Sequence, residues 1–217
     1  MEAATYLAGM GKLSLATDVA GAQVFAAKYE TVNRRLVPAD EVYLGDTPLA
    51  EFPMAMGSYR LRIVHAGHED VIYPIRIDRL GHWDGKTPEG DTPPIHLPRK
   101  GDLASDECFV PAGPFRCGGD AMAPEGLPAS SVWVDDFVIR RFQVTYADYK
   151  EYLQALHDAG LDDAFKAALP VHEAAGAGST GASCFAVDSD GRVELAEDPS
   201  GRLPEAEWPI AFVSFRQ

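Results

Sequence analysis

Three cysteines carry the greatest chemical reactivity in this sequence of 217 residues. Cys108 and Cys117 stand close together, and Cys184 stands alone further along the chain. An odd number of cysteines cannot form a fully paired set of disulfides, and only Arg116, next to Cys117, offers a nearby cation that would activate a thiol. We therefore expect reduced, mostly buried cysteines, as is typical of a cytoplasmic protein.

A second candidate for chemistry is an acidic cluster, Asp188-Ser189-Asp190-Gly191 followed by Glu194. Carboxylates at alternate positions before a glycine are typical of calcium loops, but the third acidic position and the distant Glu of an EF-hand are missing. Asp-Gly between two apolar runs is also a strong signal for a β-hairpin turn. The hairpin is the favoured interpretation, and a calcium site is the alternative.

The histidines show no spacing that is typical of a zinc site. They are His65, His68, His82, His96, His157 and His172. His65 and His68 flank a predicted sheet turn, where we expect them to face apart or toward solvent. The sequence therefore assigns no catalytic, cofactor-binding or metal-binding residue in this chain.

Composition excludes several functional classes. The net charge is −14 and the pI is about 4.7, which argues against nucleic acid and anionic membranes as partners, because both need a surplus of Lys and Arg. No apolar run approaches the ~20 residues of a membrane-spanning helix. The sequence contains no glycine-rich phosphate loop and no kinase or serine-hydrolase signature.

The first third of the chain is predicted to form short strands. Apolar and charged residues alternate from Tyr59 to Val64, which is the pattern of a strand with one buried face. Similar runs, separated by glycine turns, occur at residues 13–15, 22–29, 42–44 and 71–77. Residues 33–38 are expected to be an inserted loop. This spacing predicts an independent, mostly β sandwich over residues 11–79.

These strands resemble the PEGA domain, a small β-sandwich module of bacterial proteins. The residues that carry the resemblance are Gly21 to Val24, Gly45 to Leu49, Gly57 to Leu61 and Gly67-His68. The proline that usually precedes Gly21-Ala22 in that family is missing. Residues 80–105 contain four prolines and are predicted to be a Pro-rich connector, in which Ile95 and Leu97 pack on a domain.

Residues 108–153 are predicted to run as strand, glycine turn, two strands and helix. Gly118-Gly119 after an apolar run indicates a sharp turn or a close backbone approach. The residues from Val132 to Phe142 are rich in β-branched and aromatic side chains, which favours strands. Thr145 and Asp148 have the spacing of a capping box with Asp in place of Glu or Gln, so a helix is expected to begin there. A second helix is expected over residues 161–169.

This stretch is similar to the opening of the formylglycine-generating enzyme domain, also called the sulfatase-modifying factor domain. The similar segments are Val110 to Phe115, Gly118-Gly119, Val132 to Ile139, Val144 to Tyr149 and Trp208 to Phe215. Gln143, Tyr146 and Phe215 depart from the family's usual Glu, Asn and Trp. The resemblance implies an α+β, C-type-lectin-like domain over residues 106–217 that is incomplete, because it matches only the N-terminal part of the family's domain.

The resemblance also implies a link to oxidases. Formylglycine-generating enzymes use copper and a catalytic cysteine pair that lies late in the domain, and related oxidases use iron. Cys108 and Cys117 belong to the opening strands, so this role is not carried over to them. No cofactor is expected in this chain, and copper or iron would belong to a complete parent enzyme. A PEGA-like domain before this domain also resembles the C-terminal region of certain bacterial serine/threonine kinases.

Two functions stay open at this point. The first is a non-catalytic recognition or regulatory module, and the second is a truncated or split half of an oxidase that needs a C-terminal half. Residues 209–215 are expected to form an apolar strand with only Arg216 and Gln217 after it. Because such a strand leaves an open edge, we expect a protein partner or the missing C-terminal half to pair with it, or self-association, or a half-domain that is rearranged to hide it.

Overall fold

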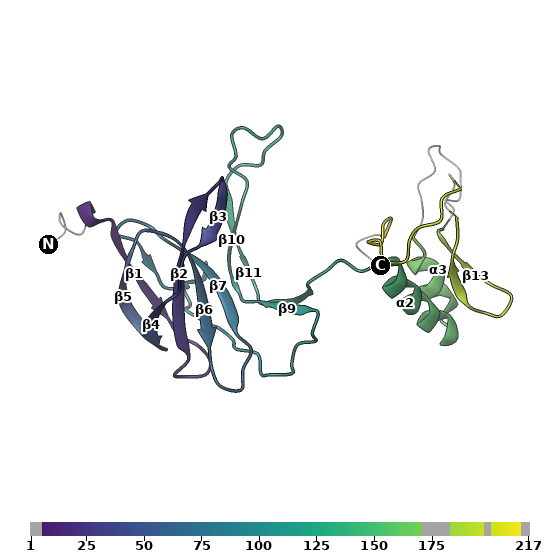
Figure 1. Ribbon diagram of the computed structural model, residues 1–217, viewed down its shortest axis with the longest axis horizontal. Coiled ribbons are helices and arrows are strands. Elements are labelled where there is room, and N and C mark those ends of the chain that lie inside the picture. The colour runs from purple at the N-terminus through teal and green to yellow at the C-terminus, as the bar shows by residue number, and fades with distance from the viewer. Residues whose placement is uncertain (1–5, 171–182, 198–200, 214–217) are drawn as a thin grey trace. The chain divides into compact units, whose positions relative to one another are not determined.

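The computed structural model describes residues 6–170, 183–197 and 201–213. The chain is mostly β and divides into two compact units, Met1–Ile139 and Arg140–Gln217, which we describe separately (Figure 1). This division groups residues by their contacts. The domain boundaries expected from the sequence, at residues 11–79, 80–105 and 106–217, remain a prediction.

A five-stranded sheet forms the larger part of the first unit (Figure 1). Its strands are β2 (Gln23–Val32), β3 (Arg35–Pro38), β4 (Val42–Asp46), β6 (Gly57–Val64) and β7 (Val71–Ile77). The order is β3-β2-β6-β7, with β4 also paired to β2. The alternation expected in β6 is confirmed, because Leu61 and Ile63 are fully buried and Arg62 lies on the other face.

A three-stranded sheet provides the other side of the same core. Its order is β5 (Leu49–Ala55), β1 (Met10–Leu15) and β8 (His82–Trp83). Leu13 and Leu15 of β1 belong to one buried cluster with the residues of β2, β6 and β7. Gly11 explains how closely the sheets approach, because a Cβ atom there would lie 2.6 Å from Ile77 Cγ2.

Two elements of the first unit differ from the sequence-based prediction. The loop expected at residues 33–38 is a hairpin, in which Asn33 and Arg34 adopt positive φ angles and Arg35–Pro38 pairs with β2. Asn at the first position suits such a turn. Strand β5 was not expected; it contains Pro53, which cannot donate a ladder hydrogen bond. The strand lies at the edge of its sheet, where a proline is tolerated.

The Pro-rich connector is tied to the start of the chain. The amide of Ile95 donates to the Ala16 carbonyl, and the amide of Asp18 donates to the Ile95 carbonyl. The Asp18 carboxylate accepts a hydrogen bond from the amide of Leu97, whose side chain is 1% exposed. The expectation that Ile95 and Leu97 pack on a domain is therefore confirmed.

Four short strands complete the first unit. They form two pairs: β10 (Gly113–Cys117) runs antiparallel to β11 (Ser130–Val134), and β9 (Glu107–Val110) pairs with β12 (Phe137–Arg140). The glycine turn is confirmed as a close backbone approach. Gly118 has a φ of 70°, and a Cβ atom there would collide with the carbonyl oxygen of Pro128.

The second unit contains two helices and a hairpin (Figure 1). Its elements are α2 (Tyr146–Asp158), α3 (Asp162–Ala168), β13 (Phe185–Val187) and β14 (Val193–Leu195). Thr145 caps α2 as expected, because its hydroxyl accepts from the Asp148 amide and the Asp148 carboxylate accepts from the Thr145 amide. Leu153, Cys184 and Val193 form the centre of its core. No helix in the described ranges is long and apolar enough to cross a bilayer.

The strand expected at residues 209–215 is not formed over its described part, residues 209–213. Pro209 makes an isolated bridge with Thr145, and the amide of Ile210 donates to the Val144 carbonyl. Phe212 has a φ of 63°, which is incompatible with a continuing strand. Residues 214 and 215, like His172 and the glycine-rich segment at 176–182, lie outside the described residues.

Candidate functional site

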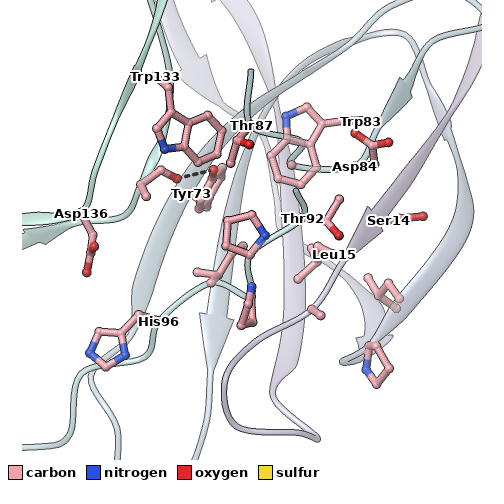
Figure 2. Close-up of a pocket in the computed structure, with 18 of the residues that line it drawn as sticks. Ser14, Leu15, Tyr73, Trp83, Asp84, Thr87, Thr92, His96, Trp133 and Asp136 are labelled. Atoms are coloured by element: carbon pink, nitrogen blue, oxygen red, sulfur yellow. Dashed lines mark hydrogen bonds between the residues drawn. The ribbon is translucent and has the colours of Figure 1, made fainter. Parts of the chain in front are cut away.

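A pocket of about 450 Å³ opens on the first unit (Figure 2). We call it the aromatic pocket. Its walls come from the end of β1, the turn before β5, strands β7 and β8 with the loop that follows, and the β11 end. The lining residues are Ser14, Leu15, Ala16, Pro48, Leu49, Tyr73, Trp83, Asp84, Gly85, Thr87, Thr92, Pro93, Pro94, Ile95, His96, Ala112, Trp133, Asp135 and Asp136.

Three aromatic side chains on three different strands define this pocket. Tyr73 and Trp83 meet edge to face, with ring centroids 5.3 Å apart and planes at 74°. Figure 2 shows Trp83 and Trp133 on two sides of the pocket, with Thr87 drawn between them. Trp83 is held by the pairing of β8 with β1, and Trp133 by the pairing of β11 with β10. Sheet hydrogen bonds therefore fix the positions of both indoles before any ligand arrives.

Tyr73 joins the N-terminal strands to the segment that contains Ala112. Its hydroxyl donates a hydrogen bond of 2.6 Å to the Ala112 carbonyl, drawn as a dashed line in Figure 2. The side chain is 4% exposed, and this burial raises the pKa of the Tyr73 phenol to about 12. Tyr73 is therefore neutral near pH 7 and presents an uncharged ring to the pocket.

The carboxylates around the pocket are of two kinds. Asp84 is paired, because Lys86 Nζ lies 2.8 Å from its Oδ2 atom, and this hydrogen bond lowers the pKa of the Asp84 carboxyl. Asp135 and Asp136 are exposed, and no other residue in the described part of the chain pairs with them or forms a hydrogen bond to their side chains. The pocket thus carries two uncompensated negative charges at the end of β11.

Other polar groups of the pocket are already engaged. His96 Nδ1 lies 2.6 Å from Asp18 Oδ2. Ser14 Oγ accepts from the Glu51 amide and lies 2.8 Å from His82 Nε2.

The hydroxyl of Thr87 is an exception among these polar groups. It is covered and has no hydrogen-bond partner among the residues that the structure describes. A buried polar atom without a partner costs about 1–3 kcal/mol. A ligand group that reached this hydroxyl after a rotation of the side chain would remove that cost.

The residues that sequence analysis considered for chemistry do not gather at this pocket. Cys108 lies in β9, Cys117 lies in β10 with its Sγ 2.9 Å from Ser130 Oγ, and Cys184 is buried in the second unit. None of the three is in a disulfide; Cys184 is buried as expected, whereas Cys108 and Cys117 are only partly buried. Within residues 6–170, 183–197 and 201–213, no three His, Cys, Asp or Glu residues lie close enough to hold a metal ion.

The acidic cluster forms the hairpin that the sequence favoured. The Asp188 carboxylate accepts hydrogen bonds from the amides of Asp190 and Arg192 and so closes the turn. Glu194 points to Lys150, with 2.9 Å between Oε2 and Nζ. Its carboxylate thus pairs with a helix residue and does not complete a ring of calcium ligands.

The expectation for His65 and His68 is wrong. The two rings do not face apart, because their Nδ1 atoms lie 3.0 Å apart and the ring planes cross at 66°. The tight turn at Ala66 and Gly67 brings them together. In this contact one ring nitrogen donates and the other accepts.

Sequence analysis missed every residue that makes the aromatic pocket distinctive. A signal was present in the sequence, because acidic residues closely follow both indoles of the pocket. Asp84 follows Trp83 at the end of β8, and Asp135 and Asp136 follow Trp133. The two sites are far apart in the chain, and only the sheet pairing of β8 and the packing of the β9–β12 segment bring them to one pocket.

Comparison with protein families matches residues 94–216 to the sulfatase-modifying factor enzyme 1-like domain. Neither the curated proteins nor the solved structures give a match. The matched stretch contributes the pocket residues from Pro94 to Asp136, whereas β1, β7 and β8 lie before it. Because the match covers more than half of the chain, this protein belongs to the family of sulfatase-modifying factor enzyme 1-like domains.

Proposed function

We propose that this chain is a non-catalytic recognition module of the sulfatase-modifying factor family, and that it binds a ligand in the aromatic pocket. The observation that carries the proposal is the pocket itself. Three aromatic rings from separately fixed strands line a cavity of about 450 Å³, within the size range of small-molecule sites. The setting that fits such a module is the regulatory region of a bacterial, kinase-associated protein.

The polar groups of the pocket favour binding over catalysis. Ser14 and His82 are the only described serine and histidine whose side chains meet at the pocket, and the Ser14 hydroxyl already accepts from the Glu51 amide. No described residue forms a hydrogen bond with His82 Nδ1, whereas a serine nucleophile needs a histidine that a third group orients.

The alternative function is a half of a formylglycine-generating or related oxidase that needs a C-terminal half. Family membership keeps this alternative open. To test it, the purified chain is incubated with copper(I) and a peptide containing Cys-x-Pro-x-Arg, and the peptide is analysed by mass spectrometry. We expect an unmodified cysteine. Formylglycine in the product would overturn the non-catalytic proposal.

Binding is tested by saturation-transfer NMR with three sets of small probes: organic cations, neutral sugars and organic anions. The full chain is compared with Trp83→Ala and Trp133→Ala variants, and Trp208→Phe serves as the matched control because Trp208 lies in the second unit. We expect at least one set to show saturation transfer that both pocket variants lose and the control keeps. If no probe distinguishes the pocket variants from the control, the pocket is not a binding site.

A further inference from the structure

We infer that the aromatic pocket takes an organic cation, such as an alkylated ammonium or a guanidinium group. This inference rests on the proposed binding function and names its ligand class. The cationic group would lie among the rings of Tyr73, Trp83 and Trp133, in a pocket whose lining also includes Asp135 and Asp136.

The aromatic composition of the walls is the first reason. The face of an indole or phenol ring carries negative charge density, so a cation over the ring is attracted, most strongly when water is excluded. Tyr73 cannot act as a donor to a ligand, because its hydroxyl already donates to Ala112. Tyr73 therefore offers a ligand only its ring. The two indoles offer the faces of their rings.

The charge of the lining is the second and independent reason. The lining contains three aspartates and no lysine or arginine. Lys86 compensates Asp84, and Asp18 pairs with His96, so Asp135 and Asp136 supply the net charge. An anionic ligand would be repelled by these two carboxylates, whereas a cation would compensate them.

A neutral polar ligand fits less well. A sugar is held by several directed hydrogen bonds, and three of the pocket's polar side chains are engaged with protein groups: Tyr73 with Ala112, His96 with Asp18, and Ser14 with Glu51 and His82. A cation surrounded by methyl groups needs few directed hydrogen bonds. It gains instead from ring faces, apolar walls and diffuse negative charge, which the pocket provides.

The cation has two possible sources with the same chemistry. It is either a free small molecule or the side chain of a lysine or arginine in a peptide segment. Choline serves as the free probe, and Nα-acetyl-Nε-trimethyllysine amide serves as the side-chain probe. If the trimethyllysine amide binds more than tenfold more tightly than choline, the source is a peptide. If the two affinities are equal, the source is a free cation. Both results support the inference.

The decisive comparison uses choline and 3,3-dimethylbutan-1-ol, which has the same shape without the charge. Titration calorimetry on the full chain is expected to give choline the lower Kd by about tenfold. The variant Asp135→Asn/Asp136→Asn is expected to weaken choline by about fivefold and to leave the alcohol unchanged. The double variant Glu30→Gln/Asp40→Asn is the control, because it removes two exposed carboxylates outside the pocket and changes the net charge equally.

The outcomes separate this inference from the proposed function. If choline and the alcohol bind with equal affinity, and Trp133→Phe weakens the binding of both, the inference of a cationic ligand is wrong but the pocket remains a binding site. The inference of a cationic ligand is also wrong if Asp135→Asn/Asp136→Asn binds choline with the same affinity as the control variant Glu30→Gln/Asp40→Asn. If neither probe binds and no probe set senses Trp83 or Trp133, both the inference and the proposed function are wrong.

Discussion

Replacing Tyr73 by Phe should produce a stability difference that changes sign with pH. Near pH 8 the variant lacks the hydrogen bond of 2.6 Å to the Ala112 carbonyl. Such a bond contributes about 1 kcal/mol net, and the half-buried Ala112 keeps the cost near that value because water can reach its carbonyl. The unmodified chain should therefore be the more stable of the two by about 1 kcal/mol.

At alkaline pH the phenol of Tyr73 lowers the stability of the folded state. Burial raises its pKa from the ordinary value of 10.0 to about 12, so the folded state holds the proton more tightly than the unfolded state. Stability from this group is complete below pH 10 and is lost as the pH rises toward 12. The full loss is about 2.7 kcal/mol at 1.36 kcal/mol per pKa unit, and about half of it has occurred at pH 11.

Phenylalanine does not titrate, so the two stability curves should cross between about pH 10 and pH 11. The assay is urea unfolding at pH 8, 10 and 11, followed by fluorescence in a Trp208→Phe background, where both remaining tryptophans lie in the first unit. Tyr29→Phe is the matched control, because the structure gives its hydroxyl no described hydrogen-bond partner. A constant difference from pH 8 to pH 11 would refute the burial argument, and no difference at pH 8 would refute the hydrogen bond.

Three further changes test the packing of each unit by thermal or urea unfolding. Leu61→Asp buries an unpaired charge at a fully buried site and should cost about 3 kcal/mol or more, whereas Leu36→Asp, at a site 67% exposed, should change little. Gly11→Ala places a Cβ atom 2.6 Å from Ile77 Cγ2 and should cost about 2 kcal/mol; an unchanged midpoint would show that the sheets can separate there. Thr145→Ala removes the capping box of α2 and should cost about 1 kcal/mol in the second unit alone, so an equal loss in the first unit would contradict the division into two units.

Local patterns in the sequence predicted most elements correctly. The alternation in β6, the capping box at Thr145 and the Asp190-Gly191 turn each depend on residues a few positions apart. Such signals can be read without knowledge of the tertiary contacts. Strand β5 was not predicted. A proline such as Pro53 is unfavourable in a central strand, and only the sheet order shows that this strand lies at an edge.

The candidate site could not be predicted in the same way. Trp83 lies in a two-residue strand inside a Pro-rich segment, and its position depends on the parallel pairing of β8 with β1. Trp133 reaches the pocket because the segment around Ala112 is fixed to Tyr73. Both relations join residues that are distant in the sequence, and no periodicity reports them. The tail at residues 209–213 was predicted wrongly for the opposite reason. Its apolar run is typical of a strand, but the backbone there is irregular and lies beside Val144 and Thr145.

The position of β1 has a consequence for synthesis on the ribosome. Its partners are Phe52 and neighbouring residues on one side and His82-Trp83 on the other, so its sheet is completed only after residue 83 has left the exit tunnel. Until then Leu13 and Leu15, which emerge before residue 83, have no finished core to enter. At about 5–20 residues per second this interval lasts seconds, during which the nascent segment is open to chaperones and to pairing with other nascent chains.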